Sequence, residues 1–195
     1  MKQLNSAFNL LSGFNGEAPS AEVCLDVKYD FANPQVNGRT IEGNPIKIQL
    51  NGNRFSNRNE LEVARTLFHE LIHAEMYRKI QSVGGRENLN IDNFPGLFDY
   101  YSRYFKVRQR NGTWHYPNGT PQHNLMAEHY IGFITDALME YDGVAKQDQQ
   151  LRSLYEALAW MGLEITTVWE SKSDHEKQTI ENQQRQIRQG RSGCN

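Results

Sequence analysis

Apolar and polar residues alternate in two short segments before the middle of the chain. Over residues 23–29 every second residue is Val, Leu, Val or Tyr, and Ile46, Ile48 and Leu50 alternate with polar residues in the second segment. Alternation with a period of two is typical of a strand with one buried face. Turn-forming pairs such as Asn37-Gly38 separate the two segments. The pattern predicts a small antiparallel sheet here, with half-buried strands.

A long helical pattern follows the second strand. Asn59 and Glu62 form a capping-box pattern, no glycine or proline occurs from Leu61 to Met76, and Gly84-Gly85 supplies a stop. Apolar residues occupy nearly every side of this segment, so we expect the helix to run through the protein interior.

The rest of the chain is expected to be mainly helical. Asn111-Gly112 and Asn118-Gly119 bracket residues 114–116 and predict a small hairpin or exposed loop after an aromatic-rich segment. Apolar spacing predicts helices over about 124–141 and 147–161, whereas residues 171–195 are polar enough for a solvated helix or a tail. We therefore expect a single α+β domain over residues 1–170, mainly helical, with the sheet preceding the long helix.

Composition narrows the functional classes. The 195 residues carry a net charge of −2, which gives no signature for nucleic acid, and no apolar stretch is long enough to span a membrane. Two cysteines, Cys24 and Cys194, exclude a disulfide framework and a cysteine-rich zinc ribbon. The start of the sequence lacks the pattern of a signal peptide, so a cytoplasmic protein is expected, and secretion stays open if the natural start lies elsewhere.

The long predicted helix contains the sequence His69-Glu70-Leu71-Ile72-His73. Residues four apart lie on the same face of a helix, so both imidazoles can reach one metal ion while Glu70 projects beside them. A buried helix with this HExxH spacing predicts a catalytic Zn²⁺ site, in preference to two core histidines bonded to backbone carbonyls.

A catalytic zinc ion needs a third protein ligand and one open position for water. Metzincins place a glycine and a third histidine shortly after the motif, but Met76 and Lys79 occupy those positions here. The remaining candidates are Glu87, His115, His123, Glu128, His129 and His175.

Helical geometry separates the candidates near residue 125. His123 falls on the inward face of the predicted helix, in line with Met126. Glu128 and His129 point well away from that face. We therefore expect His123 to be the third ligand, with Glu128, His129 and His115 as alternatives.

The stretch TLFHELIHAEMY, residues 66–77, resembles the zincin metallopeptidases and among them the SprT-like (Spartan-type) group. In that group a histidine at a loop-to-helix junction completes the HExxH helix, and QHNLMAEHY at residues 122–130 is similar to such a junction, although it follows after an unusually long interval. LYEALAWMGLEITTVW at residues 154–169 is similar to the ends of small HExxH proteins of Bacteroidetes bacteria and their phages. The resemblance is specific over residues 60–80 and looser over 121–169.

This resemblance implies a bacterial protein with a zincin-like fold, a Zn²⁺ cofactor and a peptide or protein substrate. SprT-like proteins act on DNA-bound proteins, but this chain has neither a basic surface nor a cysteine ribbon, so that substrate is not carried over. Glu70 is expected to act as general base, and Tyr130, or alternatively Tyr77, to stabilise the oxyanion. Asp136 or Glu75 is the expected hydrogen-bond acceptor behind the ligands.

Two other functions remain open at this stage. The first is a zinc-stabilised binding or effector protein without catalysis, which the carboxylate of Glu70 disfavours, because a structural zinc site has no use for a base beside the metal. The second is a metal-free helical interaction domain that uses the aromatic-rich segment as its interface.

Overall fold

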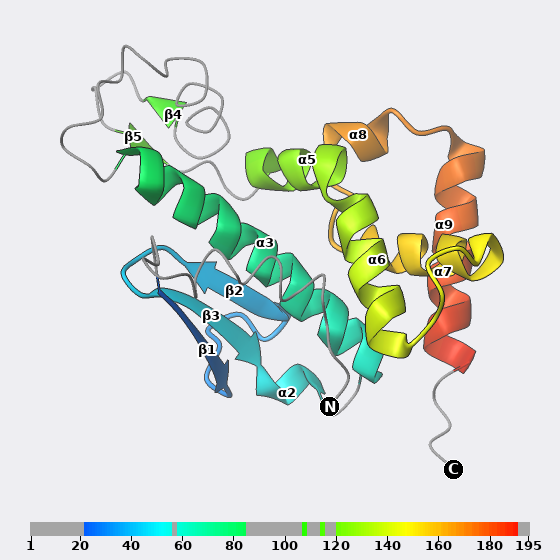
Figure 1. The fold of residues 1–195 in the computed structure, drawn as a ribbon, viewed down its shortest axis with the longest axis horizontal. Helices are drawn as coiled ribbons and strands as arrows, with labels where there is room; N and C mark the ends of the chain where they lie inside the picture. The colour runs from blue at the N-terminus through cyan, green and yellow to red at the C-terminus, as the bar shows by residue number, and fades with distance from the viewer. Residues whose placement is uncertain (1–21, 56–57, 85–106, 109–113, 116–119, 191–195) are drawn as a thin grey trace.

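The computed structural model describes residues 22–55, 58–84, 107–108, 114–115 and 120–190, so most of the aromatic-rich segment lies outside the described residues. Its long helix α3 separates a small sheet on one side from a group of helices on the other (Figure 1). The elements are β1 (Val23–Lys28), β2 (Gly38–Ile41), β3 (Ile46–Asn51), α2 (Gly52–Phe55), α3 (Glu60–Gly84), β4 (Val107–Arg108), β5 (Trp114–His115), α5 (Thr120–His129), α6 (Ile131–Asp142), α7 (Gln149–Ala159), α8 (Thr167–Glu170) and α9 (Asp174–Gly190). The predicted α+β, mainly helical fold with a sheet before the long helix is confirmed.

The sheet has the strand order β1-β3-β2 and is mixed rather than antiparallel. β3 lies in the centre, pairs with β2 in the antiparallel sense and with β1 in the parallel sense. β1 and β3 are parallel because β2, the strand between them in sequence, pairs on the far edge of β3. The sequence pattern identified β1 and β3 but not β2, whose four residues show no clean alternation.

The two predicted strands differ in burial. Ile46, Ile48 and Leu50 of β3 are all buried and belong to the core against which α3 packs. On β1, by contrast, the side chains of Leu25 and Val27 are 57% and 42% exposed. The expectation of a half-buried strand is therefore wrong for β1, which forms an edge of the sheet.

The long helix α3 begins as predicted. The backbone N–H of Glu62 donates a hydrogen bond to Oδ1 of Asn59 over 2.9 Å, which satisfies one of the free amides of the first turn. Most of its described side chains up to Met76 are buried. This helix therefore runs through the interior, as its apolar pattern predicted.

The helix predicted over 124–141 is two helices. α5 begins earlier, at Thr120, and the chain bends at Tyr130 before α6 starts at Ile131 (Figure 1). Tyr130 has φ of −118°, away from the helical value, and the β-branched Ile131 and Gly132 that follow it have low helix propensity. The bend sends α6 alongside α3 and leaves α5 at one end of the helical group.

The C-terminal part is also helical. α7 begins at the predicted position, where Asp148 caps the N–H of Leu151. α9 packs against α7 and buries Gln184, so residues 174–190 belong to the folded body and are not a separate tail. β4 and β5 pair in the antiparallel sense, as the expected hairpin requires, and the residues between them lie outside the described part of the chain. Within the described residues, none of the helices combines the length and the apolar character that crossing a bilayer requires.

Candidate metal centre

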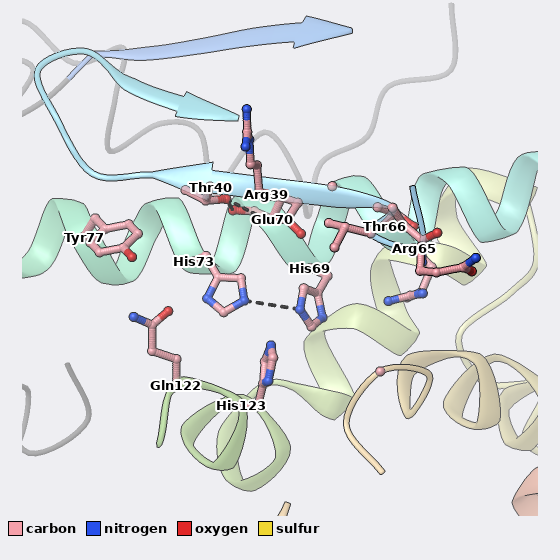
Figure 2. Close-up of a pocket in the computed structure, with 15 residues that line it drawn as sticks. Arg39, Thr40, Arg65, Thr66, His69, Glu70, His73, Tyr77, Gln122 and His123 are labelled. Carbon is pink, nitrogen blue, oxygen red and sulfur yellow. Dashed lines mark hydrogen bonds between the residues drawn. The ribbon is translucent and has the colours of Figure 1, made fainter. Parts of the chain in front are cut away.

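His69 and His73 lie one turn apart on the same side of α3 (Figure 2). Both side chains are buried, and their Nε2 atoms face each other at 3.2 Å. Two histidine nitrogens that bind one tetrahedral zinc ion at about 2.0–2.1 Å are separated by about 3.3 Å. The helix thus presents two nitrogen ligands at the separation that one zinc ion requires.

His123 joins these two histidines from α5, on the opposite side of the pocket (Figure 2). Its ring centroid lies 5.2 Å from that of His69 and 5.3 Å from that of His73. One ligand atom from each of the three residues lies within 4.8 Å of the other two. The structure therefore brings together the three residues expected to be metal ligands.

The donor set fits zinc in charge as well as in spacing. Burial holds the pKa of His69 well below its usual value and lowers that of His73 to about 3; mutual repulsion among the three rings contributes. Burial also lowers the pKa of His123. The rings are therefore neutral at neutral pH, the form in which imidazole binds a metal.

Each of the three histidines also keeps a buried Nδ1 atom without a hydrogen-bond partner among the described residues. The two carboxylates expected behind the ligands are used elsewhere. Asp136 forms an ion pair with Arg152 at 2.6 Å, and Glu75 forms one with Arg78 at 2.6 Å. The expectation that Asp136 or Glu75 accepts a hydrogen bond from a ligand histidine is therefore wrong. Each of these carboxylates binds an arginine instead, and the Nδ1 atoms of the histidines stay without a partner among the described residues.

Glu70 lies beside the histidine cluster, turned toward β2. Oγ1 of Thr40 donates a hydrogen bond to Oε2 of Glu70 over 2.7 Å and lies 2.9 Å from the backbone oxygen of the same residue (Figure 2). Burial raises the pKa of the Glu70 carboxyl to about 7, while the hydrogen bond from Thr40 and the charge of Arg65 oppose this rise. A carboxyl group with this pKa can accept and release a proton near neutral pH.

The three histidines and Glu70 line a pocket of about 620 Å³. Its other lining residues are Gln35, Val36, Asn37, Gly38, Arg39, Thr40, Arg65, Thr66, Tyr77, Gln122 and Gly162. Strand β2 forms one wall, while Gln122 and His123 of α5 approach from the other side (Figure 2). The volume is in the range of small-molecule and peptide-side-chain sites.

Of the two tyrosines considered as oxyanion donors, only Tyr77 is among the described residues that line the pocket. The side chain of Gln122 hydrogen-bonds Tyr77, and burial raises the pKa of the Tyr77 hydroxyl. Tyr130 lies instead at the bend between α5 and α6.

Three of the alternative ligands lie away from the cluster. Glu128 and His129 are exposed at the end of α5 and contact each other at 3.6 Å. His175 is exposed on α9. The side chain of His115 and the whole of Glu87 fall outside what the structure describes.

Several lining residues were not singled out as functional from the sequence, among them Gly38, Thr40, Arg65 and Gln122. The only available signal was position, since Arg65 precedes His69 by one helical turn and Gln122 is next to His123. Gly38 shows why a glycine stands there. A Cβ atom at this position would lie 3.0 Å from Cγ of Glu70 and 3.2 Å from atoms of Leu50 and Thr66. The missing side chain lets β2 approach the motif helix.

Comparisons of this chain with protein-family models, with curated proteins and with solved structures give no match.

Proposed function

We propose that this chain is a zinc-dependent peptidase of the zincin type. The observation that carries the proposal is the buried carboxylate of Glu70 beside three neutral histidines in an open pocket. His69, His73 and His123 would hold the ion. When bound, zinc supplies Lewis-acid activation of a water molecule and of the substrate carbonyl.

The residues of the chain supply the remaining parts of the reaction. The Glu70 carboxylate takes the proton from the attacking water and passes it to the leaving amine. Thr40 orients that carboxylate through its hydrogen bond. Tyr77 is the hydroxyl best placed in the pocket to donate to the oxyanion, because Gln122 fixes it there.

The substrate proposed for this site is an extended peptide. β2 is the strand at one edge of the sheet, and its residues Gly38, Arg39 and Thr40 line the pocket along the motif helix. An edge strand offers backbone groups that can pair with a peptide laid beside it. The same strand therefore holds the base through Thr40 and can hold the substrate.

A zinc-stabilised binding protein is the second candidate. It shares the histidine cluster, but it gives no reason for a fourth, proton-accepting group beside an open pocket. Glu70→Gln distinguishes the two functions, since only a catalyst needs the proton acceptor.

The test combines metal analysis with peptide cleavage by purified protein. We expect one zinc ion per chain, and cleavage in a peptide-library assay. Glu70→Gln should keep the zinc and lower turnover by about 10²-fold or more, because the proton acceptor is lost. His123→Ala should bind zinc much more weakly in competition with a chromophoric chelator.

His129→Ala is the matched control for His123→Ala. It removes a histidine from the same helix but from its exposed side, so zinc affinity should stay at the wild-type value. Absence of zinc after reconstitution would overturn the proposal, and so would full activity in Glu70→Gln.

A further inference from the structure

Arg65 lies one turn before His69 on the side of α3 that faces the pocket. Arg65, His69, His73 and Tyr77 follow each other at intervals of four residues, and all four line the pocket. Figure 2 shows the guanidinium group beside His69, on the side away from His73. The positive charge of Arg65 is close enough to lower the pKa of both His69 and His123.

This cation is buried, and it has no hydrogen-bond partner among the residues that the structure describes. The side chain of Arg65 is only 5% exposed, and its Nε atom has no hydrogen-bond partner within the described part of the chain. Burial lowers its pKa to about 10, so the group stays charged at neutral pH. An unpaired buried charge is unfavourable, and proteins usually supply an opposite charge.

The neighbouring carboxylates that attract Arg65 are each bonded to another group. Oε2 of Glu164 accepts a hydrogen bond from the backbone N–H of Gly162 at 2.6 Å. Glu70 accepts one from Thr40 at 2.7 Å, and Glu62 accepts one from Arg188 at 3.2 Å. These three carboxylates therefore compensate the charge of Arg65 from a distance, without direct hydrogen bonds.

Space is available at the end of the guanidinium group. Gly162 lines the pocket opposite Arg65, with φ of +85°. The nearest atom to a Cβ built at Gly162 is Nη1 of Arg65, at 3.5 Å. A side chain at position 162 would project toward the guanidinium group. Because Gly162 has none, the outer face of the Arg65 guanidinium group is open to the pocket.

We propose that Arg65 binds a carboxylate group of the substrate, next to the bond that is cleaved. A planar carboxylate can accept two parallel hydrogen bonds from one guanidinium group. A single negative charge also suits this place better than a doubly charged phosphate group, because the carboxylates of Glu62, Glu70 and Glu164 outnumber the two cations, Arg65 and the neighbouring Arg58. This inference rests on the proposed peptidase function and specifies its substrates: peptides with an acidic side chain, or a free C-terminal carboxylate, beside the cleaved bond.

The first experiment compares zinc-loaded wild type on quenched fluorescent alanine-rich peptides in which one Glu, Gln, Lys or phosphoserine is moved through the sequence. We expect kcat/KM to favour Glu over Gln at one position by about 10- to 100-fold, the equivalent of one charge-assisted hydrogen-bonded pair. Pairs of peptides with a C-terminal acid or amide distinguish the terminal carboxylate from the side chain. A phosphoserine peptide preferred over Glu, or no preference for either acidic group, would overturn the inference.

The second part assigns the preference to Arg65. Arg65→Gln should abolish it, and Arg65→Lys, which keeps the charge but not the paired hydrogen bonds, should retain only a fraction of it. Arg39→Gln is the matched control, because Arg39 also lines the pocket but donates to Gln49. It should keep the preference. If Arg65→Gln lowers kcat/KM equally for the Glu and the Gln peptides, Arg65 supports activity without recognising a carboxylate, and the inference is overturned.

A binding measurement separates this inference from the proposed function. Zinc-loaded Glu70→Gln protein is titrated with the same labelled Glu and Gln peptides, without any need for turnover. If wild type cleaves no peptide but the Glu peptide binds more tightly in an Arg65-dependent way, the peptidase proposal fails and the carboxylate site stands. If peptides are cleaved and Glu and Gln bind alike, the carboxylate site fails and the peptidase stands.

Discussion

At the scale of the residue, two buried imidazoles and a third, half-buried one are costly for a protein without a metal. The rings of His69, His73 and His123 must stay neutral inside the fold, whereas the same side chains pick up protons freely in the unfolded chain below their ordinary pKa of 6.5. Glu70 behaves in the opposite way, because its pKa is raised to about 7 in the fold from an ordinary value of 4.5. The metal-free protein should therefore be strongly sensitive to pH.

The direction of this pH dependence follows from the number of protons that the folded and the unfolded chain bind. Between pH 4.5 and 6.5 the unfolded chain gains up to three protons on the histidines and lacks the one that folded Glu70 carries. The difference approaches two protons, and each is worth about 1.4 kcal/mol per pH unit. The free energy of unfolding of chelator-treated protein should fall by about 3 kcal/mol per pH unit as the pH drops below 6, measured by urea denaturation.

Two variants check the origin of this slope. His123→Ala should make this dependence on pH shallower, while His129→Ala, on the exposed side of α5, should leave it unchanged. A metal-free protein with constant stability from pH 5 to 7 would show that these rings are not buried in the neutral form.

At the scale of the element, the sequence predicted what local pattern controls. The strands β1 and β3, the long helix and the start of α7 follow from spacing and capping, and His69, Glu70 and His73 follow from the motif. β2 and the bend at Tyr130 do not, because they depend on packing against α3 and not on the pattern of their own residues. The prediction that His123 faces the two motif histidines is confirmed, because the helical spacing behind it involved only the residues of α5 next to His123, while its role as a ligand stays a prediction. The partners Thr40 and Arg65 come from tertiary contacts, which leave no local signal.

The close approach of β2 to α3 gives an element-scale prediction. Gly38→Ala places a methyl group 3.0–3.2 Å from side-chain atoms of Glu70, Leu50 and Thr66, so these side chains or β2 must give way by a few tenths of an ångström. We expect a loss of about 1–2 kcal/mol in the free energy of unfolding. Activity should fall further than stability explains, because the closest of these atoms belongs to Glu70 and its displacement disturbs the hydrogen bond with Thr40.

Gly132→Ala is the matched control, because it is the same change inside α6 with nothing within 4 Å of the new methyl group. It should stabilise the protein by up to about 1 kcal/mol, since alanine favours a helix. Chemical denaturation and peptide cleavage of both variants provide the measurement; a Gly38→Ala protein as stable and active as wild type would contradict the close packing.

At the scale of the whole molecule, α3 is contacted from both sides. The sheet supplies Thr40, the helical group supplies His123, and the site forms where the two groups meet along α3. α7 packs against α3 and α6, and α9 covers α7. The helix α9 should thus support the site indirectly, because it holds α7 against the other helices that surround α3.

The buried glutamine of α9 tests this support. Nε2 of Gln184 donates a hydrogen bond to the backbone oxygen of Ala157 over 2.8 Å, inside the contact between α9 and α7. Gln184→Ala should lower the free energy of unfolding by about 1–2 kcal/mol, because the carbonyl loses its partner in a buried place. Gln186→Ala, on the exposed side of the same helix, should cost less than about 0.5 kcal/mol. Equal melting temperatures for the two variants would mean that α9 is not packed as described.

The ion pair between Arg188 and Glu62 also sets an order in time. During synthesis, Glu62 leaves the ribosome 126 residues before its partner, and every residue of the candidate metal centre has been made by the end of α5. A nascent chain therefore contains all three candidate ligands well before α9 can form its ion pair with the first turn of α3. Translation that stops before residue 188 would yield a polypeptide with the three candidate ligands and without this ion pair.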